Sequence, residues 1–213
     1  MDGMGNNTLK KRVEKTIQAL HKNNMSGVFV QDETALLGVL KNLLRENAVV
    51  GVGDSVTLDE TGVLDLLRSG RYVFLDKYRD GISREEKREI YIKNFSSDFF
   101  LCSTNALTEE GELYNIDGNG SRVAPMIYGP KQVIIVTGTN KIVRNMEEAI
   151  HRVKNFAAPL DAKRLNKNTP CAKLGHCVDC KSPQRICNSV VTIARQFDPN
   201  RIKVIIVNKA LGY

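Results

Sequence analysis

Apolar residues recur every three or four positions along several stretches of the chain, with polar residues filling the positions between them. This period is typical of amphipathic helices. The stretches that predict helices span residues 9–23, 32–44, 62–68, 83–94, 145–157 and 189–196. Short runs of mainly apolar residues separate them and predict buried strands over residues 28–30, 48–52, 72–75, 98–103, 113–116, 132–137 and 202–207.

Strands and helices alternate from residue 28 to residue 103, and this order predicts a mainly parallel sheet covered by helices on both faces. The pattern changes after residue 103. A turn over residues 109–112, a strand and a tight loop at residues 117–120 follow one another closely, which is typical of a β-hairpin. The expected fold class is therefore α/β, with a β-hairpin inserted into the parallel pattern.

The composition agrees with this fold. The chain has 213 residues, 42% hydrophobic and 26% charged, and suits a single domain that includes a cysteine-rich segment at residues 166–190. A chain of this length buries about 70% of its unfolded surface, so its core requires neither a metal nor a disulfide. Residues 1–7 carry no signal-peptide pattern and the apolar runs are too short to span a membrane, so we expect a cytoplasmic protein.

The net charge of +7 raises the question of a nucleic-acid partner. Basic residues are interleaved with acidic ones, aromatic residues make up only 6%, and no tryptophan is present. Binding of single strands needs a basic groove with stacking aromatic side chains, and no such stripe is visible. We therefore expect no nucleic-acid partner, whereas attraction of anionic metabolites fits the positive charge.

Four loops rich in small and hydrogen-bonding residues follow predicted strands, at residues 51–57, 103–108, 117–122 and 138–141. In open α/β sheets, ligands bind outside the carboxyl ends of the strands, where glycine permits close approach and free N–H groups attract anions. Ordinary turns use the same residues for structural reasons. The candidate ligand-binding residues are Gly51, Gly53, Asp54, Ser55, Thr104, Asn105, Asp117, Gly118, Gly120, Arg122, Gly138, Asn140 and Lys141.

These loops also carry a family resemblance. Residues 50–57, VGVGDSVT, look like the first ligand loop of the NagB/RpiA/CoA-transferase-like fold. Residues 103–113, STNALTEEGEL, and 117–124, DGNGSRVA, resemble the signature of the LUD (lactate-utilisation) domain family, and the GTNK turn at residues 138–141 continues it. The resemblance covers about residues 9–157, and Ser121 departs from it because many members have asparagine there.

The resemblance implies a three-layer α/β/α domain and a role in oxidising lactate or a related 2-hydroxy acid, in or beside an iron–sulfur oxidoreductase. Related enzymes of the fold use a carboxylate, which would point to Glu60, Glu109, Glu110 or Asp117. We single out Asp117 as the catalytic candidate, although an aspartate there can also accept hydrogen bonds from its own turn. Arg122 can grip a carboxylate through paired hydrogen bonds, or form a surface ion pair instead.

Four of the five cysteines form the pattern C-x5-C-x2-C-x6-C, at Cys171, Cys177, Cys180 and Cys187. Two thiolates two residues apart can meet one metal centre, and the outer pair completes a four-thiolate site. Both a [4Fe–4S] cluster and Zn²⁺ accept this set, and the spacing differs from the ferredoxin run. We expect His176 to stay outside the ligand set and Cys102 to be a core residue.

Three functional hypotheses follow. The first is a lactate-utilisation-type protein that binds a small organic anion at the strand-end loops and is associated with iron–sulfur electron transfer. The second is an enzyme of the sugar-phosphate isomerase or CoA-transferase type, and the third a non-catalytic subunit with a zinc-stapled loop. The expected partners are the organic anion and an iron–sulfur oxidoreductase subunit, with no membrane span; a homodimer is only a general expectation for such a chain.

Overall fold

A six-stranded sheet forms the centre of the molecule in the computed structural model, which describes residues 3–213. All of its neighbouring strands are parallel. In spatial order they are β1 (Ser26–Val30), β10 (Ile202–Val207), β7 (Gln132–Gly138), β4 (Phe99–Cys102), β2 (Val49–Val52) and β3 (Val73–Phe74). The predicted parallel sheet is confirmed, and the strand pairs place residues 202–207 between the two earlier strands β1 and β7.

Helices cover both faces of this sheet, which gives the three layers expected of the fold. The helices are α1 (Gly3–Lys22), α2 (Glu33–Leu43), α3 (Val56–Glu60), α4 (Val63–Leu67), α5 (Arg84–Lys93) and α6 (Val123–Ile127), with a 3₁₀ turn, η1 (Asn94–Ser96), before β4. Alternate strand residues enter two separate cores. Leu101 of β4 packs with α2, α3 and α4, whereas Phe100 packs with α1 and α6.

A second, four-stranded sheet contains the predicted hairpin. Its order is β8 (Ile142–Val143), β5 (Ala106–Thr108), β6 (Leu113–Asp117) and β9 (Ser189–Ile193). β5 and β6 pair antiparallel, which confirms the hairpin, and β9 pairs antiparallel with β6 along its whole length. The predicted helix over residues 189–196 is therefore wrong. The run Ser-Val-Val-Thr-Ile is rich in β-branched residues, which favour strands, and it pairs with the edge of β6 that β5 leaves free.

The helix predicted over residues 145–157 continues further than expected. It consists of α7 (Met146–Arg152), a π-helical turn η3 (Val153–Ala157) and α8 (Ala158–Arg164), and a short α9 (Pro170–Leu174) follows. Asn145 caps α7 by accepting a hydrogen bond from the N–H of Glu148 (3.0 Å). Pro159 falls at the start of α8, where its missing N–H costs nothing because the π turn has already interrupted the α-helical pattern.

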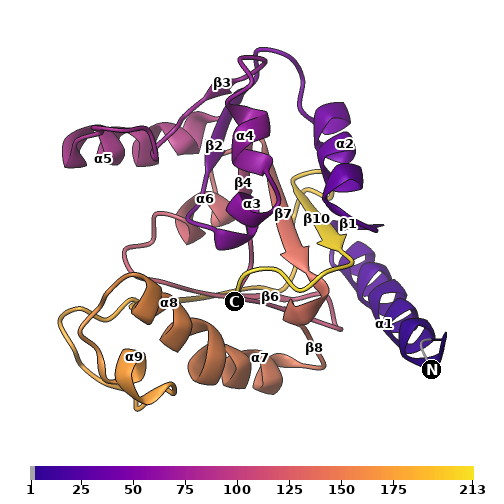
Figure 1. Cartoon of the computed structure of the whole chain (residues 1–213). Helices are drawn as coiled ribbons and strands as arrows, with labels where there is room; N and C mark the ends of the chain where they lie inside the picture. The colour runs from indigo at the N-terminus through magenta and orange to yellow at the C-terminus, as the bar shows by residue number, and fades with distance from the viewer. Residues whose placement is uncertain (1–2) are drawn as a thin grey trace.

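The carboxyl ends of the parallel strands point toward the second sheet and toward α7 and α8 (Figure 1). Residues 208–213 run between these two parts of the molecule, where the C-terminal end is marked (Figure 1). No helix within residues 3–213 has the length and apolarity needed to cross a bilayer. The signal-peptide prediction involves residues 1–2, which lie outside the described residues.

Candidate functional site: a buried cationic cluster at the strand ends

Three of the strand-end loops meet at one amine. Lys141 ends the 3₁₀ turn η2 (Thr139–Lys141), directly after β7. Its Nζ donates to Thr57 Oγ1 (3.0 Å) and to Ser103 Oγ (3.1 Å). Thr57 lies in α3, shortly after β2, and Ser103 directly follows β4. Since β2, β4 and β7 are neighbours in the sheet, their parallel direction brings these side chains to the same edge.

Lys141 is only 4% exposed. Burial lowers the pKa of its amine to about 7, and the positive charges of Arg152 and Arg122 act in the same direction, while Glu60 and Asp161 oppose them. Within residues 3–213, no carboxylate lies close enough to Lys141 for an ion pair. A buried lysine is ordinarily paired with an acid, so this one is an exception.

The buried amine should make the stability of the protein depend on pH. The pKa of Lys141 is about 7 in the folded chain against 10.5 for an ordinary lysine. Between these values the unfolded chain holds a proton that the folded chain has released, so the free energy of unfolding rises with pH across this window. Lys141→Met should therefore raise the free energy of unfolding at pH 7 by about 2–4 kcal/mol, an advantage that shrinks toward pH 10. Urea unfolding across this pH range measures it, and identical pH profiles for both proteins would contradict it.

Arg152 of α7 is the second cation of the site. It is half-buried, and its Nε and Nη1 donate to the carbonyl oxygens of Asn140 (3.2 Å) and Asn105 (2.7 Å). Burial lowers the pKa of Arg152 to about 10. Within the described part of the chain its Nη2 donates to no protein acceptor and its guanidinium has no ion pair. Arg152 therefore retains a donor and an uncompensated charge beside Lys141.

Arg122 is the third cation, and its hydrogen bonds stay within the protein. Nη1 donates to Ser103 O (2.8 Å) and Asn115 Oδ1 (2.7 Å), and Nη2 donates to Asn105 Oδ1 (2.9 Å) and Ile116 O (2.8 Å). The side chain is buried and joins the end of β4 to β5 and β6. This geometry leaves only Nε for a ligand, so it favours a structural role over the predicted grip on an anion.

Asp117 also serves its own loop. Its Oδ1 accepts from the N–H groups of Asn119 (3.0 Å) and Gly120 (2.8 Å), and its Oδ2 accepts from those of Arg122 (3.1 Å) and Val123 (3.3 Å). These contacts are those of the turn-stabilising alternative. These four N–H donors occupy both oxygens of the carboxylate. The geometry therefore gives no support to Asp117 as a catalytic residue.

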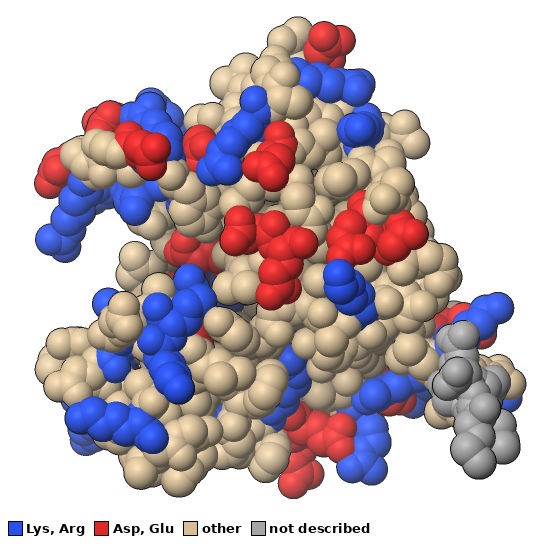
Figure 2. Space-filling view, in the orientation of Figure 1, with Lys and Arg blue, Asp and Glu red and all other residues tan. Residues whose placement is uncertain are grey.

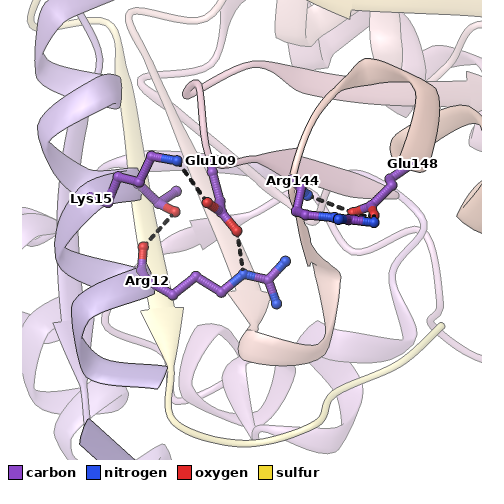
Figure 3. Close-up of polar contacts among 6 residues, drawn as sticks. Arg12, Lys15, Glu109, Arg144 and Glu148 are labelled. Carbon is purple, nitrogen blue, oxygen red and sulfur yellow. Dashed lines mark hydrogen bonds and ion pairs between the residues drawn. The ribbon is translucent and has the colours of Figure 1, made fainter. Parts of the chain in front are cut away.

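The other carboxylate candidates lie in different places. Glu109 joins the β5–β6 turn to α1, where it accepts from Arg12 Nε (2.6 Å) and Lys15 Nζ (2.9 Å) (Figure 3). Glu110 is exposed in the same turn. Glu60 lies nearer to the site, and its Oε2 accepts from the N–H of Gly212 (2.7 Å). Of these three side chains, only Glu60 belongs to the surroundings of Lys141.

The candidate glycines make close contacts with the protein itself. A Cβ on Gly51 would lie 2.2 Å from Asn94 Oδ1, and one on Gly53 would lie 2.6 Å from Arg122 Cγ. A Cβ on Gly138 would lie 2.5 Å from the carbonyl oxygen of Lys209. These three positions therefore need glycine for internal packing. Gly118 and Gly120 lie in the Asp117 turn, where Gly120 adopts a positive φ of 82°.

Most of the remaining candidates hold the loops in place. Ser55 caps α3 through Leu58 N–H (3.2 Å). Thr104 Oγ1 donates to Ala106 O (2.9 Å). The Asn140 amide exchanges two hydrogen bonds with the backbone of Leu211 (3.1 and 3.3 Å). These residues shape the site, and Asn105 does so through its contacts with Arg122 and Arg152.

Sequence reasoning missed an ion pair next to these loops, between a buried lysine and an exposed aspartate. Lys77, 1% exposed, follows β3 and donates to Asp54 Oδ1 at 2.8 Å. Tyr78 donates to the same oxygen at 3.1 Å, and the Lys77 amine lies 5.3 Å from the centre of the Tyr91 ring. Burial lowers the pKa of Lys77, whereas Asp54 favours its charged form. The candidate ligand residue Asp54 therefore already has a cationic partner.

Candidate functional site: the four cysteines

Cys171, Cys177, Cys180 and Cys187 all line one cavity, together with Arg185 and residues of α8. All four are free thiols. The cavity measures about 20 Å³ and is largely apolar. The sequence spacing therefore corresponds to a spatial cluster, since cysteines spread over seventeen positions of the chain line one cavity.

Three of the four sulfurs contact a hydrogen-bonding group. Cys177 Sγ accepts from the N–H of Asp179 (3.3 Å), Cys187 Sγ accepts from Arg185 Nη2 (3.3 Å), and Cys171 Sγ lies 3.3 Å from Thr169 Oγ1. Hydrogen bonds to the sulfurs are among the levers that tune an iron–sulfur cluster. The donor set and its surroundings therefore fit a thiolate-bound metal centre.

Zinc and a [4Fe–4S] cluster would use the same four cysteines in different arrangements. Within residues 3–213, no three histidine, cysteine or acidic side chains are arranged to hold a single metal ion. Zinc needs four ligands around one point at about 2.3 Å. In a [4Fe–4S] cluster each thiolate binds a different iron, so the sulfurs surround a wider space.

The cysteine segment is attached to the strand-end loops. Asn188 N donates to Asp117 O (2.9 Å), and Asn188 Nδ2 donates to Gly118 O (2.9 Å). On the other side, the N–H of Cys177 donates to the carbonyl oxygen of Lys154, two residues after Arg152. The Asp117 loop and α7 therefore contact both the cysteine segment and the cationic cluster.

The surface near the cationic cluster and the cysteine segment is acidic on one side and basic on the other (Figure 2). Acidic side chains gather over α3, which carries the exposed Asp59 and Glu60, and basic side chains gather over α8, which carries the exposed Lys163 and Arg164. A field of this kind attracts an anion from the α8 side.

The fold and site define a three-layer α/β protein with unpaired cations at the carboxyl edge of a parallel sheet and a four-thiol cavity beside it. A family model described as the LUD domain matches residues 13–207. The chain therefore belongs to the LUD domain family, which is associated with lactate utilisation.

Two solved structures are similar to the chain. A DUF162 family protein from Deinococcus radiodurans is 13% identical, with a TM-score of 0.53 over 93% of this chain and 98% of that one, and this likeness shows the fold alone. Ribose 5-phosphate isomerase from Plasmodium falciparum is 16% identical, with a TM-score of 0.33 over 53% of this chain and 52% of that one. None of the curated proteins matches the chain.

Proposed function

We propose that the protein binds a small organic carboxylate, such as lactate or a related 2-hydroxy acid, at Lys141 and Arg152. One observation carries this proposal: these two cations and Arg122 lie together at the strand ends without an ion pair among the described residues. Buried charges are normally paired, because an uncompensated charge in a dry site is costly. A bound anion would supply the missing negative charge.

The surrounding groups suit a 2-hydroxy acid. Arg152 Nη2 has no acceptor among residues 3–213 and can donate to a carboxylate oxygen, and Lys141 supplies a second donor. The hydroxyl groups of Thr57 and Ser103 already contact the Lys141 amine, so they can accept from or donate to a neighbouring substrate hydroxyl. The carboxylates that an isomerase or CoA-transferase mechanism would use are instead hydrogen-bonded within the protein, at Asp117 and Glu60.

We also propose that the four cysteines hold a [4Fe–4S] cluster rather than zinc. Their common cavity supports a shared metal centre, and the association of the LUD domain family with lactate utilisation, which is an oxidation, favours a centre that carries electrons. Such a cluster transfers single electrons when it is bound. In this protein, the cluster would be held by Cys171, Cys177, Cys180 and Cys187. Arg185 would donate a hydrogen bond to the sulfur of Cys187. An iron–sulfur oxidoreductase subunit is the partner that such a function requires.

Anion binding has a direct test. Lactate and pyruvate at millimolar concentrations should raise the melting temperature of the wild-type protein, since a ligand that binds only the folded state stabilises it. Arg152→Gln should abolish this increase and Lys141→Met should weaken it, because each removes one positive charge from the site.

Arg144→Gln provides a matched control, because Arg144 is an exposed arginine that is paired with Glu148 close to the same helix. Its response to lactate should equal that of the wild type. Loss of the response in Arg144→Gln, or an unchanged response in Arg152→Gln, would contradict the proposed site. Calorimetric titration of the same proteins gives the dissociation constants.

A further inference from the structure

Two buried lysines near the strand ends differ in their partners. Lys77 is bound to Asp54 at 2.8 Å, which favours its charged form. Among residues 3–213, the Lys141 amine donates only to the hydroxyl oxygens of Thr57 and Ser103, and its pKa is lowered to about 7. A lysine that is desolvated or lies next to other cations becomes a nucleophile at neutral pH. Lys141 satisfies both conditions, since it is buried and lies near Arg152.

We propose that the Lys141 amine forms an imine with the carbonyl carbon of a small 2-oxo acid. This inference rests on the proposed function, because the 2-oxo acid is the oxidised counterpart of the 2-hydroxy acid assigned to the same site. Arg152 holds the carboxylate and so places the neighbouring carbonyl carbon beside Nζ. Lys141 then acts on the ligand covalently, beyond its role as a positive charge.

The reaction balances without an oxidant or a cofactor. The lone pair of the neutral amine attacks the carbonyl carbon, and the carbonyl oxygen takes up a proton to give a carbinolamine. A second proton transfer to this oxygen releases water, and the C=N double bond of the imine forms as the nitrogen loses its protons. The hydroxyl groups of Thr57 and Ser103 lie 3.0 and 3.1 Å from Nζ, where they can relay these protons.

Residues 209–213 determine how a ligand reaches the amine. Gly212 lies over the site with a φ of +54°, and a Cβ there would lie 2.7 Å from Thr57 Oγ1 and 3.3 Å from Lys141 Nζ. Its N–H donates to Glu60, and Leu211 is held by Asn140. The segment therefore has to shift before a ligand reaches the Lys141 amine.

Reductive trapping tests the imine. The whole protein, prepared anaerobically, is incubated with pyruvate and sodium cyanoborohydride near pH 7.5, and the labelled lysine is found by peptide mass spectrometry. We expect a saturable adduct on Lys141 that forms about tenfold or more faster than adducts on other lysines. Lys77 is the internal control, because it is equally buried but paired. Lactate lacks the carbonyl, so it should form no adduct and should slow labelling by pyruvate.

The outcomes separate this inference from the proposed function. If pyruvate raises the melting temperature but Lys141 is unlabelled, or is labelled no faster than exposed lysines, the imine is rejected and anion binding stands. If neither pyruvate nor lactate binds and no adduct forms, both proposals fail. Lys141→Arg has no amine that can form an imine, so it should lose the adduct. An undiminished adduct yield in this variant would overturn the assignment.

Discussion

Cys177→Ser should leave the anaerobically purified protein without iron and without visible absorption. The wild-type protein should be brown and contain iron in the amount that one [4Fe–4S] cluster per chain requires. Cys177 belongs to the C-x2-C core, and its sulfur lines the shared cavity. Loss of one thiolate from a four-thiolate site leaves one metal atom without its protein ligand, and metal binding is coupled to the folding of the segment that provides the ligands. Iron and zinc analysis with visible spectroscopy measures the effect.

Cys102→Ala is the matched control for this experiment. Cys102 is the fifth cysteine, fully buried in the core beneath the sheet as its sequence context predicted, and it does not line the cysteine cavity. Its replacement should cost some stability and leave the iron content unchanged. A colourless wild-type protein with one equivalent of zinc would reject the cluster and would favour the zinc-stapled loop instead.

The sequence predicted the body of the fold well, because the evidence for it is local. Buried parallel strands are short apolar runs, and the helices between them begin at strong caps such as Asp32 and Ser83. The helix predicted at residues 189–196 failed for a non-local reason. A strand with no neighbour in sequence is recognised only when its partner is known, and the partner of β9 is β6, about seventy residues earlier.

The candidate site was predicted in part. The spacing of the cysteines identified their cluster because two thiols in a C-x2-C turn are already close. Lys141 was found because it follows a strand and a glycine turn. Arg152 was missed because it looks like any charged residue on an amphipathic helix, and only the packing of α7 against the loops reveals its position. Lys77 was missed in the same way, since its burial depends on Asp54, which is distant in sequence.

Arg122 shows why a motif residue is easily misread. The guanidinium group that binds carboxylates can equally bind carbonyl and amide oxygens of the protein, and the sequence does not indicate which acceptors are nearby. In the structure the acceptors are Ser103, Asn105, Asn115 and Ile116. The first two belong to the run 103–113 that carried the family resemblance, and the other two lie between that run and residues 117–124. The motif therefore fixes the segment that follows β4, so that the Ser103 hydroxyl contacts the Lys141 amine.

Arg122→Ala should consequently be among the most destabilising substitutions in the chain. Arg122 is only 8% exposed, and its removal would take away four hydrogen bonds, two of them buried and two partly buried. Each hydrogen bond to a charged group contributes about 1.5–3 kcal/mol, and loss of a buried network costs about 3–5 kcal/mol in total because its members are not additive. Urea unfolding should show a loss of this size, with Arg122→Lys in between because one ammonium group cannot reach all four oxygens.

Arg144→Ala serves as the control for stability, because Arg144 is mostly exposed and its ion pair with Glu148 contributes at most about 1 kcal/mol. The contrast separates the two roles considered for Arg122. If Arg122 serves mainly to bind an anion, Arg122→Ala should remain as stable as Arg144→Ala and lose only lactate binding. If Arg122 instead holds the segments after β4 and around β5 and β6 in place, Arg122→Ala should lower the free energy of unfolding and should lose lactate binding as a consequence. A temperature low enough to keep this variant folded should then restore part of the binding.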